Sequence, residues 1–189
     1  NTFTNREIGV KWELFQDFDL TAALFEIEQS SPQVADDDPS TLDVIESEIS
    51  GFELQIQGQI TENWFLSAGY SYLEGEQVDR SGSTGKSPRE LPENMLSLWN
   101  NYQLTDKLGV GVGLTFQDES FINNGNSATL PSYTRFDLSA YYYVSEKLRL
   151  QLNIDNLTDE LYFPNAHSTH QASVGAPFSA RLSFSRQLQ

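Results

Sequence analysis

The chain has 189 residues and a formal net charge of -16, from 27 acidic and 11 basic side chains. This excess of negative charge argues against a nucleic-acid-binding protein, which needs a basic surface. The sequence has no Cys, which excludes disulfides and thiolate metal sites, and it has no run of about 18 apolar residues that could form a transmembrane helix.

Alternation of apolar and polar residues predicts nine β-strands along the chain. In the sixth, residues 108–116, every second side chain is large and apolar, and Gly109, Gly111 and Gly113 lie between them. In the eighth, Leu and Ile alternate with Arg, Gln, Asn and Asp. The predicted strands cover residues 7–14, 19–28, 47–60, 64–73, 94–104, 108–116, 133–144 and 148–155, and a ninth run follows Pro177 to the chain end.

The connections between these strands alternate in length. Short turns are expected at 16–18, 61–63, 105–107 and 145–147, and long loops at 29–45, 74–93, 117–130 and 158–176. Strands with one apolar and one polar face, joined by short turns at one end and long loops at the other, are typical of outer-membrane barrels. The predicted fold is therefore all-β, an antiparallel transmembrane β-barrel.

Aromatic residues gather near the short turns, where a barrel places its interfacial girdle. The alternative is a soluble, secreted all-β binding module, in which two sheets pack their apolar faces together and the aromatic residues lie in the core. The residues concerned are Trp12, Phe15, Phe18, Trp64, Phe65, Tyr102, Tyr142 and Tyr143.

Few residues have the pattern of a catalytic or metal site, so we do not expect an enzyme. The sequence has no G-x-S-x-G motif, and its two histidines, His167 and His170, both lie in the last predicted loop. Three consecutive acids at 36–38 lack the spacing of a calcium-binding loop. Neither group predicts a bound metal or cofactor.

Six segments, spread over most of the chain, carry a family resemblance. Residues 51–58 read GFELQIQG and residues 64–72 read WFLSAGYSY, and residues 91–102 contain Pro92, Trp99 and Tyr102. Residues 130–137 read LPSYTRFD, residues 153–162 read NIDNLTDELY, and residues 175–177 read GAP. In this order they resemble motifs of TonB-dependent outer-membrane receptors, among them the siderophore receptors. Phe178 departs from the pattern, since the family usually has Arg there.

The resemblance implies a plugged barrel of about 22 strands. Residues 1–189 would be its C-terminal portion, with the plug, the TonB box and the N-terminal strands absent. It further implies a bacterial outer-membrane receptor, in contact with lipid, that takes up ferric siderophores with energy supplied by TonB. Haem, cobalamin or a glycan are alternative ligands. Ligand contacts are expected at Tyr162, Phe163 and His167, and the inward glycines would leave room for the plug.

The turn at 145–147 also predicts the register of the seventh and eighth strands. If Val144 faces Leu148, then Tyr142 faces Leu150, Ala140 faces Leu152 and Leu138 faces Ile154, all on the outward side. This register places Asp137 opposite Asp155 on the inward side. Like charges in that arrangement repel, so a cation is expected beside them, from Arg135 or Arg181.

Overall fold

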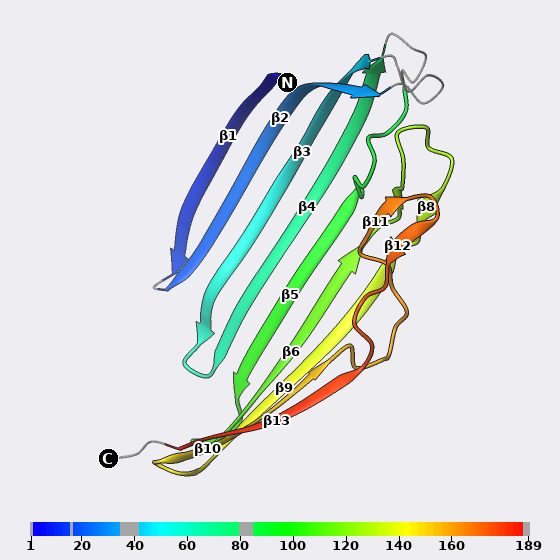
Figure 1. The fold of residues 1–189 in the computed structure, drawn as a ribbon. Helices are drawn as coiled ribbons and strands as arrows, with labels where there is room; N and C mark the ends of the chain where they lie inside the picture. Colours follow the sequence, from blue (N-terminus) through cyan, green and yellow to red (C-terminus); the bar gives the residue numbers. More distant parts are fainter. Residues whose placement is uncertain (1, 16, 35–41, 80–84, 187–189) are drawn as a thin grey trace.

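The computed structural model describes residues 2–15, 17–34, 42–79 and 85–186, and it contains one antiparallel sheet of nine strands side by side (Figure 1). Their order in the sheet follows the chain: β1 (Thr2–Phe15), β2 (Phe18–Val34), β3 (Leu42–Thr61), β4 (Trp64–Asp79), β5 (Asn94–Gln103), β6 (Leu108–Gln117), β9 (Tyr133–Ser145), β10 (Leu148–Asp155) and β13 (Ser179–Arg186). No helix among the described residues is long and apolar enough to cross a membrane.

All nine predicted strands are present, and two predicted loops are shorter than expected. The expected loop at 29–45 is partly strand, since β2 continues to Val34 and β3 begins at Leu42, and β4 likewise continues to Asp79. The three acids at 36–38 lie outside the described residues. Two small hairpins were not predicted, because strands this short carry no readable alternation: β7 (Ser120–Phe121) with β8 (Thr129–Leu130), and β11 (Asn165–Ser168) with β12 (Gln171–Ser173).

One face of the sheet is apolar across its whole width. The register aligns Val110, Ala140, Leu152 and Leu182 in one row across β6, β9, β10 and β13. Leu182 is 72% exposed, so no second sheet covers this row among the described residues. The expected sidedness of residues 108–116 is confirmed, and the two-sheet sandwich is not seen. An uncovered apolar face of this width fits contact with lipid rather than with water.

The opposite face carries the polar side chains, and its glycines correct one expectation. Instead of leaving room for a plug, the glycines of β6 lie under aromatic rings of the neighbouring strands. A Cβ on Gly111 would come within 2.8 Å of the Trp99 ring, and Gly113 faces the same ring. Tyr141 covers Gly109 in the same way, so the wall itself fills this space.

The β9–β10 hairpin has the predicted register in its middle but not at its turn, and its pairs end at Leu138 and Ile154, short of the expected pair of Asp137 with Asp155. Tyr142 pairs with Leu150, and the two further predicted pairs towards the strand ends also form. Leu148 pairs with Ser145 and not with Val144, because the register shifts at the start of β10. The Ser145 hydroxyl accepts a hydrogen bond from the Lys147 N–H at 3.3 Å, which closes a tighter turn than expected.

On β2–β4 the apolar face changes character part way along the strands. Leu24, Phe52 and Tyr72 form the last apolar row, in which the Phe52 and Tyr72 rings stack at 5.9 Å. Beyond this row the same face carries exposed acidic side chains, among which Arg6 pairs with two glutamates at 3.2 and 2.7 Å. The apolar part of this face therefore ends at the Phe52 row. The acidic side chains are Glu26, Glu28, Glu48, Glu74 and Glu76.

Candidate functional site

Three long connections meet at one end of the sheet and pack against one another (Figure 1). They are residues 85–93, the connection bearing β7 and β8, and the connection bearing β11 and β12. Ile122, Leu130 and Ala166 form a buried apolar cluster between the last two, and Ala128 and Phe163 pack against it. Because the sheet itself has one uncovered apolar face, this loop body holds most of the buried apolar side chains.

Hydrogen bonds join the first two connections to the top of β4. Gln77 is fully buried, and its Nε2 donates to the carbonyls of Ser87 at 2.7 Å and Asn124 at 3.1 Å. Asn126 accepts from the Ser87 N–H at 2.9 Å and donates back to the Ser87 carbonyl at 2.8 Å. The sequence signalled a turn here, through the run Asn-Asn-Gly-Asn at 123–126, but gave no sign that the turn binds a distant segment.

The base of the last long connection is held by Asn156, which is 1% exposed. Its Oδ1 accepts from the Glu160 N–H at 2.9 Å, and its Nδ2 donates to the Glu160 and Ala176 carbonyls at 2.9 and 3.0 Å. Its own N–H donates to Asp137 at 2.9 Å. Asn156 has φ of 53°, a left-handed conformation that Asn adopts more readily than most residues. The Asn156 side chain thus joins the two ends of the loop, and its backbone N–H joins them to β9.

Tyr162 fixes the same loop from its other side and is only 6% exposed. Its hydroxyl accepts a hydrogen bond from Arg135 at 3.1 Å, and its ring packs on Tyr133 with centroids 4.6 Å apart. Arg135 also pairs with Asp137 at 2.9 Å, which confirms the predicted arginine beside that carboxylate. The Tyr162 ring covers Gly175, where a Cβ would overlap it.

The three residues expected to contact ligand differ from one another in exposure. Tyr162 is buried in the contacts just described, and Phe163 is half-buried against the apolar cluster. His167 is exposed on β11, and His170 is exposed in the turn that follows, with its Nδ1 3.4 Å from the Ser168 hydroxyl. Within the described part of the chain, no group of three or more His, Asp or Glu side chains is arranged to hold a metal ion.

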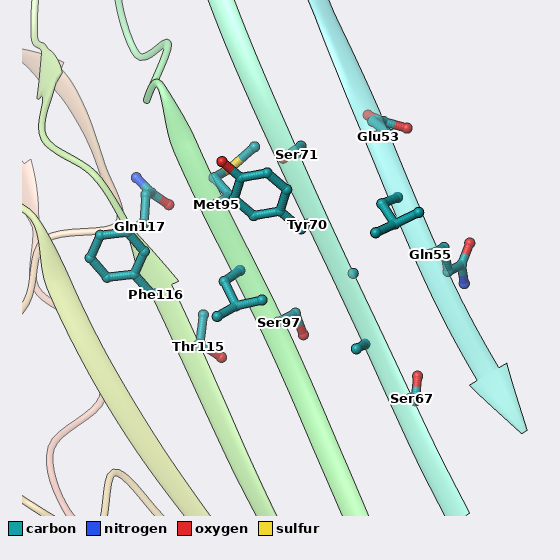
Figure 2. Close-up of a pocket in the computed structure, with 14 residues that line it drawn as sticks. Glu53, Gln55, Ser67, Tyr70, Ser71, Met95, Ser97, Thr115, Phe116 and Gln117 are labelled. Atoms are coloured by element: carbon teal, nitrogen blue, oxygen red, sulfur yellow. The ribbon is translucent and has the colours of Figure 1, made fainter. Parts of the chain in front are cut away.

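A separate hollow of about 450 Å³ lies in the wall itself, among β3, β4, β5 and β6 (Figure 2). It forms around three small residues, Ser67, Ala68 and Gly69, and a Cβ on Gly69 would meet no heavy atom within 4 Å. Larger neighbours such as Tyr70 and Phe116 border it (Figure 2). The hollow lies along the strands rather than among the loops, so the loop body remains the candidate site.

Comparison with known proteins gives a consistent set of relatives. Residues 2–157 match the family described as TonB dependent receptor-like, beta-barrel. The chain is 36% identical over 189 residues to the probable TonB-dependent siderophore receptor PiuA of Acinetobacter baumannii, an alignment that covers 93% of this chain and 25% of that protein. The chain therefore spans about a quarter of the length of that curated relative.

Solved structures agree with the sequence relatives. The crystal structure of the siderophore receptor PiuA from Acinetobacter baumannii matches with a TM-score of 0.90 at 35% identity, over 97% of this chain and 28% of that chain. The ferripyoverdine receptor of the Pseudomonas aeruginosa outer membrane, solved with ferripyoverdine bound, matches with a TM-score of 0.79 at 27% identity, over 97% of this chain and 27% of that chain.

Proposed function

This chain belongs to the TonB-dependent receptor family through its β-barrel domain, and from this we propose that it works in the uptake of ferric siderophores. The family is one of outer-membrane receptors, and the chain is an outer-membrane β-barrel protein. The observation that carries the proposal is the one-sided sheet: its outer face is apolar and uncovered, as lipid requires, and its inner face is polar. Relatives named as siderophore receptors support the ligand class.

The proposal includes the place of the chain in a larger receptor. Residues 1–189 form the C-terminal portion of the barrel, and the plug and the N-terminal strands lie outside this sequence. TonB acts through that plug, and the outer face meets membrane lipid. We propose a role as a receptor rather than as an enzyme, and the net charge of -16 disfavours nucleic acid as a partner.

Within this receptor, we assign ligand contact to the last long connection. His167 is exposed and accessible from outside, so it is the residue proposed to touch the ferric complex directly. Tyr162 and Phe163, also expected as ligand contacts, are proposed to support that surface from beneath, Tyr162 through Arg135 and Tyr133 and Phe163 through the apolar cluster. Aromatic and imidazole groups suit a large, partly aromatic metal chelate.

Uptake of radioactive iron tests this function. The full-length receptor, expressed in a strain that lacks its own siderophore receptors, is supplied in turn with a ferric catecholate, ferrioxamine and ferripyoverdine. Energised uptake of at least one complex, lost when TonB is deleted, is the expected result. Uptake of haem, cobalamin or an oligosaccharide instead would replace the siderophore by that ligand, and no transport of any of them would overturn the proposal.

A further inference from the structure

A pair of neighbouring side chains holds both backbone polar groups of one residue, Ala166, in the last long connection. Glu90 Oε1 accepts a hydrogen bond from the Ala166 N–H at 2.7 Å. Arg89 Nη2 donates to the Ala166 carbonyl at 3.0 Å and to Glu90 Oε2 at 3.1 Å. The contacts close a ring, in which two side chains offer one acceptor and one donor, as a neighbouring β-strand offers them through its backbone.

The backbone of Glu90 is itself held in an uncommon conformation. Its φ is 53°, in the left-handed region that non-Gly residues other than Asn, Asp and His rarely adopt. Its N–H donates to the Phe121 carbonyl at 2.7 Å, on β7. Glu90 therefore contacts β7 through its backbone and β11 through its carboxylate. A strained backbone of this kind persists where the surrounding contacts determine it.

Ala166 is much more deeply buried than Arg89 and Glu90, and this difference decides which contacts hold the hairpin. The Arg89 and Glu90 side chains are 44% and 33% exposed, so water and salt weaken their mutual attraction. Ala166 is 3% exposed and packs with Ile122 and Leu130, so its N–H and carbonyl need protein partners. The two hydrogen bonds to Ala166, rather than the ion pair, hold the β11–β12 hairpin to the loop body.

We propose that Arg89 and Glu90 are positioning residues that keep the β11–β12 hairpin preformed, so that the exposed surface at His167 meets its ligand already ordered. The proposal rests on the function given above for the identity of that ligand and for its contact at His167. If the hairpin is ordered in only a fraction of the unbound molecules, the apparent affinity for the ligand falls in proportion to that fraction. The pair would thus raise affinity without touching the ligand.

We call the two hydrogen bonds that join Arg89 and Glu90 to Ala166 the clamp. Hydrogen exchange on the complete receptor, without ligand, tests it. Glu90→Asn keeps a residue that accepts the left-handed backbone but is too short to reach Ala166, and Glu90→Gln keeps the acceptor. Glu160→Gln, in the same loop and without a side-chain partner among the described residues, is the matched control. The Ala166 amide should exchange about tenfold faster or more in Glu90→Asn. Glu90→Gln and the control should change it little. Unchanged exchange in Glu90→Asn would overturn the clamp.

Transport of the ferric complex selected by the uptake panel tests the positioning role. Glu90→Asn should raise KM for transport several-fold and leave the maximal rate unchanged. The rise would be about tenfold if the hairpin is ordered in only about a tenth of the unbound molecules. Glu90→Gln should restore KM. Faster Ala166 exchange without a change in KM would overturn the positioning role. If no ferric complex is transported, the proposed function fails, and ligand-free exchange still decides the clamp.

Discussion

Replacing Asn156 by Ala should detach the base of the last long connection. The substitution removes three side-chain hydrogen bonds of 2.9 to 3.0 Å from a residue that is 1% exposed. At about 1 kcal/mol each they amount to about 3 kcal/mol. Ala at φ of 53° adds about 1 kcal/mol, so the total is about 4 kcal/mol. This loss of stability is an upper value. Once the loop base opens, the freed carbonyls form hydrogen bonds with water, and no further stability is lost.

Hydrogen exchange at the Glu160 and Gly175 amides measures this opening, since both donate to partners within the loop base. Asn165→Ala is the matched control: Asn165 is exposed in the same connection, and its change should stay within about 0.5 kcal/mol. Asn156→Asp separates the two causes, because Asp tolerates the left-handed backbone but turns an oxygen towards two carbonyls. It should open the base as Ala does. A stable Asp variant, or equal effects of Asn156→Ala and Asn165→Ala, would refute the hydrogen-bond reasoning.

Two further predictions concern glycines. Gly175→Ala should destabilise the same loop by about 1–3 kcal/mol, because the new Cβ overlaps the Tyr162 ring, which Tyr133 holds on its other side. Limited proteolysis of the folded receptor should cut this loop faster in the variant, and resistance equal to that of the wild type would contradict the prediction. Gly111→Ala should lower the free energy of unfolding by a similar amount, since its Cβ falls 2.8 Å from the Trp99 ring, whereas Gly69→Ala should change it by no more than about 0.5 kcal/mol. Urea unfolding in detergent compares the two variants, and equal midpoints would contradict the contact argument.

The strands and their faces could be predicted because side chains in a strand alternate with a period of two. The same alternation predicted three residue pairs of the β9–β10 hairpin. Val144 was misplaced, since the tighter turn depends on a local hydrogen bond of Ser145, and the expected pair of Asp137 with Asp155 is not among the paired residues, which end at Leu138 and Ile154. The row of glycines on β6 was also visible. What fills it was not, because Trp99 reaches Gly111 only through the register between two strands.

The loop body could not be predicted in the same way. Gln77, Glu90 and Asn126 act on segments far away in the chain, and no periodic pattern marks a polar residue that binds a distant backbone. Asn156 and Tyr162 did stand out, as parts of a family motif, and Tyr162 was expected to contact ligand because it is an aromatic residue of a long loop. The structure places its ring in the loop base, between Arg135 and Gly175.

The unequal strands give the receptor wall a slanted rim. β3 has 20 residues and β10 has 8. At about 3.3 Å per residue and a tilt of about 40°, they rise about 50 Å and about 20 Å, against an apolar band about 25 Å tall. On the β2–β4 side the wall therefore stands well clear of the bilayer and displays its acidic rows to the cell's surroundings, while the loop body sits over the low side (Figure 1). The long and short sides of the wall therefore differ in chemistry as well as in height: the long side is acidic, and the short side carries the packed loops and the exposed His167.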